Sequence, residues 1–422
     1  MNNNSKSIYV YADWPEKDSP VKMGCLNVNI VRGREIFSFE FTSAWLRSES
    51  ARVLDPDLQF YSGRQYADPE KNNFGIFLDS SPDRWGRQLI RRREAICARR
   101  EHRTTRPLLE SDYLLGVHDA TRMGALRFKL DESSNFVSCD SELPAPPWAS
   151  LCELESACRH YEDESSTDDE HDKWLAMLLA PGSSLGGARP KANVLDNDNN
   201  LWIAKFPSRG DSVDMGAWEM VAHKLAVGAG LKVPECRMEK FSRHGGTFLS
   251  RRFDRKSGRR IHFASAMTLL GRMDGENHET GCSYLELAQF IIQHGSSPAK
   301  DLEELWKRIV FNIAVSNTDD HLRNHGFLLT RQGWILSPVY DINPNPLGGG
   351  LTLNISSDDN SLDFELALSV APKFRLDMPK ARNVLNEIRK AVGSWNRTAL
   401  DFKIPRREIE SMATAFQSHP AG

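Results

Sequence analysis

Residues 317–329 read Asn-Thr-Asp-Asp-His-Leu-Arg-Asn-His-Gly-Phe-Leu-Leu, and residues 338–344 read Pro-Val-Tyr-Asp-Ile-Asn-Pro. In the first stretch, Asp319 and Asn324 have the D-x-x-x-x-N spacing in which a carboxylate addresses a substrate hydroxyl and an amide holds a metal ion. A β-hairpin expected between the two stretches would bring Asp341 back to the same place. Two carboxylates and one amide are hard oxygen donors of the kind that suits Mg²⁺.

Neighbouring residues offer alternatives for these roles. Asp320 competes with Asp319 for the role of base, and only the spacing to Asn324 selects Asp319. His321 is interpreted as a structural residue that hydrogen-bonds this loop, because no second His or Cys stands at metal-ligand spacing. Each Asp or Asn taken singly would more often be a helix cap or a turn residue. The whole set, together with Lys205 upstream, favours a functional site.

Upstream, residues 183–191 read Ser-Ser-Leu-Gly-Gly-Ala-Arg-Pro-Lys. Glycines in a loop that enters a strand allow backbone N–H groups to approach a phosphate, although a plain turn is the alternative. The loop is not a Walker A sequence, because Ala188 stands where that motif requires Lys. Lys205 lies in the otherwise apolar strand 201–206, so we expect it to face an anion or open water. It is either a phosphate-binding lysine paired with Glu219 or an edge-strand lysine.

The order of the predicted elements indicates an α+β fold, with strands and one helix first and mainly helices later. The polar, proline-rich stretch 132–150 predicts a border between a domain 1–145 and a domain 146–422. In the second domain we expect a sheet to about residue 255 and a helical part from 256 to the end. Strands are predicted at 7–12, 25–31, 35–41, 192–195, 201–206, 247–253, 326–330 and 333–336, and helices from about 81, over 215–229 and from 302 to about 317.

Composition excludes some classes of protein. The net charge of −3 over 422 residues argues against general nucleic-acid binding as the main role, yet it hides two charged blocks. Nine arginines and two acids lie between Arg84 and Arg106, and seven acids with no Lys or Arg lie between Glu162 and Asp172. We find no apolar run of membrane-spanning length and no signal core. The seven dispersed cysteines argue against a disulfide framework or a zinc ribbon, so a reduced, cytoplasmic protein is expected.

Five motifs follow one another along the chain: Ser-Leu-Gly-Gly-Ala-Arg-Pro-Lys, Ile-Ala-Lys-Phe, Leu-Ser-Arg-Arg-Phe-Asp-Arg, Asn-Thr-Asp-Asp-His-Leu-Arg-Asn and Val-Tyr-Asp-Ile-Asn-Pro. In this order they resemble the motifs of HipA-type serine/threonine kinases, the toxins of HipBA toxin–antitoxin modules. The resemblance covers roughly residues 5 to 400. The segments 77–87 and 112–128 are similar to the N-terminal subdomain of the family.

The resemblance implies a bilobal protein-kinase-like fold, with a β-rich N-terminal subdomain, a largely helical C-terminal lobe and Mg-ATP as cofactor. It implies that Asp319 is the catalytic aspartate, that Asn324 and Asp341 bind Mg²⁺ and that Lys205 contacts the phosphates. It also implies autophosphorylation of Ser184 or its neighbour Ser183, which would silence the enzyme by repelling the ATP phosphates. The remaining ATP contacts that it implies are Ser184, Leu185, Gly186, Gly187, Ala188, Lys191, Arg251 and Phe253, the last two in an adenine hinge. Arg189 and Pro190 depart from the more polar residues common in that loop.

The partners implied by the family are a helix-turn-helix antitoxin of the HipB type and a protein substrate such as an aminoacyl-tRNA synthetase. DNA is expected only indirectly, through the antitoxin complex, and no membrane is expected. The Arg84–Arg106 helix is either a solvated face or a contact to operator phosphates in that complex. Two other functions stay open: a catalytically silent ATP-binding corepressor of an antitoxin, and a small-molecule kinase on the same fold.

Overall fold

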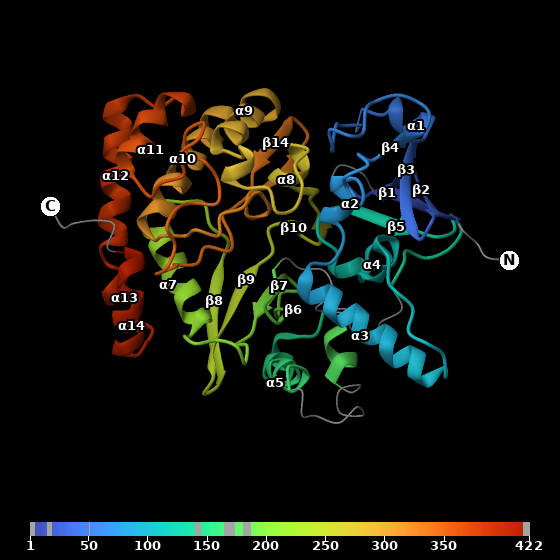
Figure 1. Cartoon of the computed structure of the whole chain (residues 1–422), viewed down its shortest axis with the longest axis horizontal. Coiled ribbons are helices and arrows are strands. Elements are labelled where there is room, and N and C mark those ends of the chain that lie inside the picture. Colours follow the sequence, from blue (N-terminus) through green and yellow to red (C-terminus); the bar gives the residue numbers. More distant parts are fainter. Residues whose placement is uncertain are drawn as a thin grey trace. The chain divides into compact units, whose positions relative to one another are not determined.

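The computed structural model describes residues 5–14, 19–49, 51–139, 145–163, 174–179 and 187–416 (Figure 1). The chain divides into two compact units. The first, which we call the N-terminal unit, comprises residues 1–210 and 254–264, and the second, the C-terminal unit, comprises residues 211–253 and 265–422.

A five-stranded antiparallel sheet forms the core of the N-terminal unit, with strand order β4-β3-β2-β1-β5 (Figure 1). Alternate side chains such as Ile8 and Val10 are buried, as the period of two predicts. The three long strands agree with those predicted, whereas β4 and β5 are too short to give a clear alternating pattern. The strands are β1 (Ser5–Ala12), β2 (Val21–Val31), β3 (Arg34–Phe41), β4 (Gln65–Tyr66) and β5 (Leu126–Lys129).

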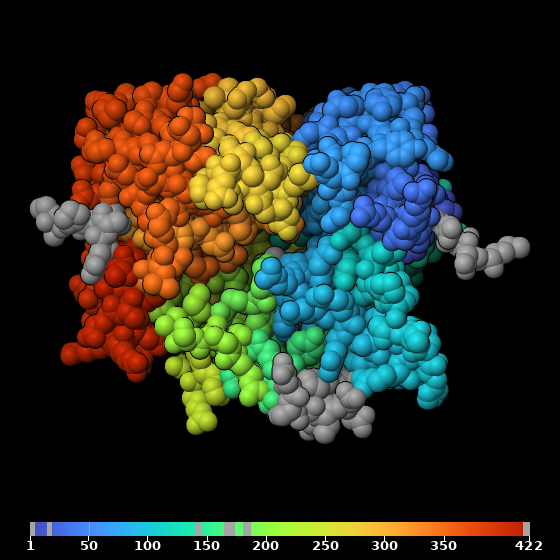
Figure 2. Space-filling model, in the orientation of Figure 1, coloured from blue at the N-terminus to red at the C-terminus, as the bar shows by residue number. Residues whose placement is uncertain are grey.

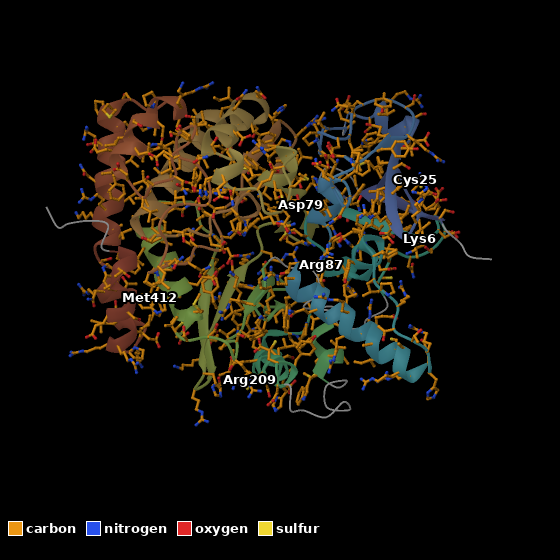
Figure 3. All side chains as sticks on the ribbon, viewed as in Figure 1. Lys6, Cys25, Asp79, Arg87, Arg209 and Met412 are labelled. Carbon is orange, nitrogen blue, oxygen red and sulfur yellow. The ribbon has the colours of Figure 1, made fainter. Side chains whose placement is uncertain are left out.

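The arginine-rich helix α3 (Arg84–Arg100) begins after Asp83, whose carboxylate accepts a hydrogen bond from the N–H of Gly86. Its buried face carries Trp85, Leu89 and Ile96, which helical spacing places on one side. Not every arginine is solvated: both terminal nitrogens of Arg87, which is labelled in Figure 3, donate to the Glu110 carboxylate over 2.6 and 2.7 Å. The other helices described in this unit are α1 (Ser43–Leu46), α2 (Gly75–Asp79), α4 (Glu110–Gly116) and α5 (Leu151–Tyr161).

The strands β6 (Lys191–Leu195) and β7 (Leu201–Lys205) form an antiparallel hairpin in the N-terminal unit. The segment around residue 146 packs on this hairpin: the N–H of Leu195 donates to the carbonyl of Pro146 over 2.9 Å, and the Trp148 and Trp202 rings lie 5.3 Å apart. The predicted domain border at 145–146 therefore falls inside a compact unit, and the domain assignment stays a prediction.

Residues 254–264 belong to the N-terminal unit because buried polar contacts hold them there. The Asp254 carboxylate accepts a hydrogen bond from the N–H of Gly124 over 2.8 Å, and Arg255 donates to the carbonyl of Arg122 over 2.6 Å. Arg260 donates to the carbonyl of Asp119 over 2.7 Å. Charged hydrogen bonds of this kind are costly to break in a buried setting. The segment contains β10 (Arg255–Lys256) and β11 (Arg259–Arg260), and β12 (Phe263–Ser265) leads into the C-terminal unit.

The C-terminal unit starts with helix α7 (Met215–Gly228), which packs on the hairpin of β8 (Cys236–Ser242) and β9 (Gly245–Arg251). Gly216 permits this packing, since a Cβ atom there would lie 2.0 Å from the carbonyl oxygen of Gly246. The predicted helix 215–229 and strand 247–253 are therefore confirmed with small shifts of their ends.

The rest of the C-terminal unit is mainly helical, and α10 (Pro298–Ala314) is its central helix. Its apolar face is buried and includes Leu305, Trp306 and Ile309. The predicted hairpin is confirmed as β13 (Gly326–Thr330) and β14 (Gly333–Leu336). The other helices are α8 (Ala266–Leu269), α9 (Tyr284–His294), α11 (Phe364–Val370), α12 (Met378–Val392), α13 (Trp395–Asp401) and α14 (Arg406–Met412).

The separation of strands and helices along the chain confirms the α+β class. All seven cysteines lie in described segments, and all are free thiols, as expected. None of the helices in the described segments is both long enough and apolar enough to cross a membrane.

Candidate active site

The segment that follows α10 carries the candidate catalytic residues of the C-terminal unit. The helix ends at Ala314, and Ser316 has a left-handed backbone with φ of 49°, which turns the chain away from the helix axis. Asp319 then projects into solvent, with a side chain that is 82% exposed. A 3₁₀ turn, Leu322–Asn324, follows directly. The predicted base is therefore accessible to a substrate.

The structure brings Asn324 to Asp319. The side-chain amide nitrogen of Asn324 donates to the main-chain carbonyl of Asp319 over 2.7 Å. This hydrogen bond uses the nitrogen of the amide, so the amide oxygen is the atom of this side chain that can bind a cation. The D-x-x-x-x-N spacing thus closes into one loop, as the sequence predicts.

Asp341 lies close enough for its charge to act on Asp319. The pKa of Asp319 is raised by desolvation against the surrounding protein, His321 opposes this, and repulsion from the Asp341 carboxylate raises the pKa further. The two acids converge because the β13–β14 hairpin returns the chain to the loop after α10. Asp341 itself has a left-handed backbone with φ of 59°, which Asp and Asn adopt more readily than most residues.

The donor set fits a magnesium ion. The Asp341 carboxylate and the amide oxygen of Asn324 would hold the cation, whose charge would offset the repulsion between Asp341 and Asp319. The described residues contain no cluster of three or more His, Cys, Asp or Glu side chains arranged to hold a metal. A cation here would depend on the Asn324 amide and on further oxygen atoms such as those of phosphates or water.

Asp320, the alternative base, is excluded from contact with a substrate by its burial, since only 1% of the residue is exposed. Its carboxylate accepts hydrogen bonds from the hydroxyl of Tyr284 and from the N–H of Thr352, the latter over 2.7 Å. Burial raises the pKa of Asp320 to about 7. Sequence reasoning missed Tyr284 as a partner, because an aromatic residue in an amphipathic helix gives the same signal as any core residue.

His321 does not hydrogen-bond the loop in the way predicted. Its Nε2 lies 3.9 Å from the Asp319 carboxylate, beyond hydrogen-bond distance, and its Nδ1 has no hydrogen-bond partner in the part of the chain that the structure describes. His325 makes such a bond instead, since its Nε2 donates to the carbonyl of Asp320 over 3.2 Å. Its pKa is lowered to about 3 by burial, so His325 is neutral and suited to donate this bond.

The predicted hinge residues are at the end of β9. The N–H of Arg251 donates to the carbonyl of Glu235 over 2.8 Å, so a contact between adenine and the backbone of Arg251 would use the carbonyl oxygen. The Phe253 ring lies 5.6 Å from the ring of Tyr340, which directly precedes Asp341. The aromatic side chain expected to pack on a base is thus next to the segment that carries the second acid.

The phosphate-loop residues belong to the N-terminal unit. Ser183, Ser184, Leu185 and Gly186 lie outside the described residues. Gly187 and Ala188 are exposed, and Gly187 has a left-handed backbone with φ of 89°, which explains the need for glycine at that position.

Lys191 and Lys205 lie directly opposite each other in the β6–β7 ladder, so their side chains share one face. Lys205 is partly exposed. Lys191 is buried, and its ammonium lies 3.1 Å from the Asp83 carboxylate, with side-chain exposures of 2% and 7%. The Lys191 charge is thus paired with Asp83 at the start of α3, and its contact with ATP stays a prediction.

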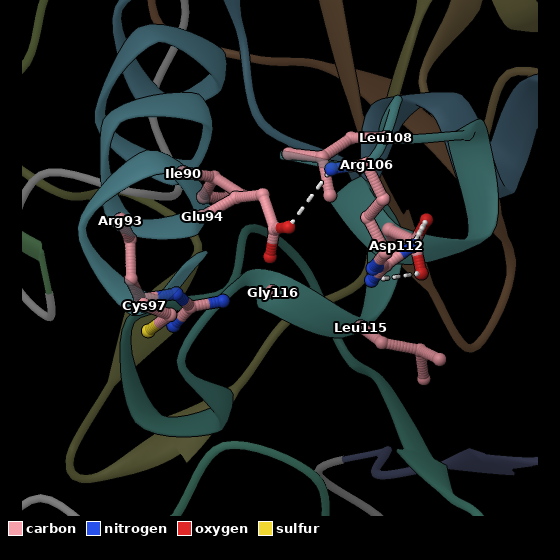
Figure 4. Close-up of a pocket in the computed structure, with 9 residues that line it drawn as sticks. All are labelled: Ile90, Arg93, Glu94, Cys97, Arg106, Leu108, Asp112, Leu115 and Gly116. Atoms are coloured by element: carbon pink, nitrogen blue, oxygen red, sulfur yellow. Dashed lines mark hydrogen bonds and ion pairs between the residues drawn. The ribbon is translucent and has the colours of Figure 1, made fainter. Parts of the chain in front are cut away.

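A pocket of about 180 Å³ lies between α3 and α4 in the N-terminal unit (Figure 4). Its acids are paired, since Glu94 accepts a hydrogen bond from Arg103 and Asp112 accepts two from Arg106. Arg93 lines this pocket rather than the solvated face of the helix. Arg87 and Arg93 therefore differ from Arg84 and Arg91, which are exposed on the same helix.

Comparison with known proteins identifies the family. The sequence model of one protein family, the HipA-like C-terminal domain, matches residues 183–396 of this chain. The chain belongs to the HipA-like family. Its matched region contains Lys205, Asp319, Asn324 and Asp341, so the resemblance inferred from the motifs is confirmed.

This HipA-like chain is similar to curated relatives that are named as kinases. It is 27% identical over 187 residues to a "Putative kinase" of Haemophilus influenzae, covering 39% of this chain and 54% of that protein. It is 25% identical over 205 residues to "Putative kinase Y4dM" of Sinorhizobium fredii, covering 43% and 49%. The HipA-like chain thus spans about half the length of these two relatives.

A solved structure establishes the fold of the HipA-like chain. It is similar to the HipA structure in a complex of the Shewanella oneidensis MR-1 toxin–antitoxin system HipA, HipB and its operator DNA. The TM-score is 0.65 at 17% sequence identity, and the match covers 97% of this chain and 94% of that one. The predicted protein-kinase-like α+β fold is therefore confirmed.

Proposed function

We propose that this HipA-like chain is an ATP-dependent serine/threonine protein kinase that acts as the toxin of a toxin–antitoxin module. The observation that supports this most is the convergence of Asp319, Asn324 and Asp341 on one loop of the C-terminal unit. An exposed carboxylate beside a second acid and an amide is the arrangement that phosphoryl transfer requires.

The reaction breaks the bond between the γ-phosphorus of ATP and its bridging oxygen and forms a bond to a serine or threonine oxygen, and ADP leaves. Asp319 orients the attacking hydroxyl and accepts its proton. Asn324 and Asp341 would hold Mg²⁺, which neutralises charge on the phosphate oxygens when it is bound. Lys205 would contact the same phosphates.

The proposal is tested by incubating the purified protein with labelled ATP and comparing wild type with Asp319→Ala. We expect incorporation to fall by at least about 100-fold in the variant, because the base is removed. Asp401→Ala is a matched control, since it deletes an exposed carboxylate of the same unit outside the site. Equal incorporation by wild type and Asp319→Ala would contradict the assignment.

The same measurements separate the alternatives. A silent ATP-binding corepressor would bind nucleotide without turning it over, so ATP turnover by the wild type argues against that function. A small-molecule kinase would phosphorylate metabolites rather than peptides or proteins. Comparison of phosphoproteomes after expression of wild type and Asp319→Ala would identify the protein substrate, for which an aminoacyl-tRNA synthetase is the class suggested by the family.

We also propose that the kinase silences itself by phosphorylation of Ser184 or Ser183. A dianionic phosphate in the phosphate loop would repel the phosphates of ATP. Mass spectrometry of active, ATP-incubated protein should find phosphate on one of these serines. Its absence from both residues would exclude this switch.

The proposed partners are a HipB-type antitoxin and, through that complex, operator DNA. In support, the Shewanella oneidensis structure contains HipA together with HipB and operator DNA. The segment of α3 lies at the surface in the view of Figure 2. Its exposed arginines would then contact DNA phosphates. We also propose a cytoplasmic location, which is in keeping with the free thiols. The domain bounds 1–145 and 146–422 remain part of the proposal.

A further inference from the structure

Asn317 opens the motif that contains Asp319, and its side chain joins the two segments that carry the acids. It is 2% exposed. Its amide nitrogen donates to the Asn312 side-chain oxygen over 3.0 Å, and its amide oxygen accepts from the N–H of Asn343 over 3.2 Å. Asn317 stands two residues before Asp319, and Asn343 stands two residues after Asp341. A single buried amide therefore links the loop of one acid to the loop of the other.

This link is anchored in the helical core. The Asn312 amide on α10 donates to the hydroxyl of Tyr284 on α9 over 2.9 Å, and that hydroxyl donates to the Asp320 carboxylate. Asn317, Asn312, Tyr284 and Asp320 are all buried. Removal of one of these side chains therefore leaves its neighbours without hydrogen-bond partners, because no water replaces them there. The position of Asn317 is therefore fixed by α9 and α10.

A second set of contacts acts at the same junction. The Asn345 amide donates to the Thr318 hydroxyl over 2.7 Å, and its N–H donates to the carbonyl of Ser316 over 3.1 Å. Gly348 lies so near Thr318 that an added Cβ atom would be 2.3 Å from the Thr318 methyl group. The segment after Asp341 is thus held against the loop of Asp319 on both sides of the Asn317 link.

We propose that Asn317 is a positioning residue that sets the separation of Asp319 and Asp341, and with it the cation affinity of the site. This rests on the proposed kinase function. Asn317 is not exposed enough to touch a substrate, so its effect acts through the two acids. Loss of its bond to Asn343 frees the Asp341 segment to shift, and a displacement of about 1 Å in such a site lowers rates on the order of 100-fold.

The test uses Asn317→Ala, with Asn354→Ala as a matched control. Asn354 is equally buried, but its amide bonds to the carbonyl of His278 and to neither acid-bearing segment. Binding of Mn²⁺ is measured by calorimetry in the presence of a non-hydrolysable ATP analogue, and kcat and KM for ATP are measured separately. We expect Asn317→Ala to weaken Mn²⁺ binding at least about 10-fold and to lower kcat more than it raises KM.

For Asn354→Ala, the Mn²⁺ affinity and the kinetic constants should stay within about threefold of the wild-type values. This should hold even if Asn354→Ala lowers the melting temperature as much as Asn317→Ala does. Equal Mn²⁺ affinity in wild type and Asn317→Ala, or an equal loss in both variants, would overturn the inference. Gly348→Ala provides a second variant at the same junction should Asn317→Ala fail to fold, and the same direction of change is expected. Absence of phosphoryl transfer by the wild type would overturn the kinase function, whereas the Mn²⁺ measurement would still decide the role of Asn317.

Discussion

The hydroxyl of Tyr284 donates a hydrogen bond to the carboxylate of Asp320 inside the C-terminal unit. Both residues are buried, and burial raises the pKa of Asp320 to about 7, with a smaller contribution from the charge on Asp319. An aspartate in an unfolded chain has a pKa of about 4. The residue next to the proposed base therefore makes the stability of this unit depend on pH.

Replacing Asp320 by Asn should remove this dependence. Between pH of about 4 and 7 the folded wild type holds the Asp320 proton while the unfolded chain loses it, so the free energy of unfolding falls as pH rises. As the pH rises from 5 to 8, the free energy of unfolding of Asp320→Asn should increase relative to that of wild type by on the order of 1–3 kcal/mol. Urea unfolding at each pH measures it. His325 contributes equally to the pH dependence of both proteins. A difference in unfolding free energy that does not change with pH would therefore contradict the raised pKa of Asp320.

The facing lysines of the β6–β7 hairpin should respond differently to mutation. Lys191→Met removes the ammonium from the buried Asp83 carboxylate, and a loss of about 3 kcal/mol in unfolding free energy is expected. Lys205→Met should instead weaken ATP binding at least about 10-fold, with a smaller loss of stability. Chemical unfolding and calorimetry with ATP separate the two effects. If Lys191→Met weakens ATP binding as much as Lys205→Met does, Lys191 also contacts the phosphates.

The arginine-rich helix can be tested by charge reversal at Arg84 and Arg91, which are exposed, whereas Arg87 and Arg93 serve the interior of the unit. If α3 contacts operator phosphates in the antitoxin complex, the double reversal to Glu should weaken DNA binding. The slope of log binding constant against log salt concentration should also become less steep, by about 0.9 for each phosphate that the helix no longer neutralises. Filter binding at several salt concentrations measures this. Reversal of Lys240 and Arg243, exposed on the β8–β9 hairpin, changes the charge equally. Identical slopes for the two variants would identify the α3 face as merely solvated.

Two glycines of α7 should give opposite results. Gly216→Ala places a methyl group 2.0 Å from the Gly246 carbonyl, and the resulting overlap should cost on the order of 1–3 kcal/mol of stability. Gly228→Ala meets only the Ala391 methyl group at 3.6 Å, an ordinary contact, and should stabilise the helix by a few tenths of a kcal/mol. Thermal unfolding of both variants measures this. A neutral Gly216→Ala would show that the helix can move away from the strand.

Much of the fold could be predicted from the sequence, because long elements leave a periodic pattern. The β13–β14 hairpin lies at its predicted positions, whereas α10 begins four residues before the predicted start at 302 and ends about three residues before the predicted end near 317. The contact between Asn324 and Asp319 agrees with their spacing. Short strands such as β5 have too few residues for a period to appear. The Tyr284 bond to Asp320 could not be predicted either, because it joins residues 36 apart that no sequence pattern links.

The left-handed backbone of Asp341 decides which substitution can report on its charge. Alanine at this position would remove the carboxylate and also impose backbone strain of about 1 kcal/mol, so a loss of activity would mix two causes. Asparagine adopts this conformation as readily as aspartate and differs mainly in lacking the charge. The geometry of one residue thus makes Asp341→Asn the informative variant and Asp341→Ala an ambiguous one.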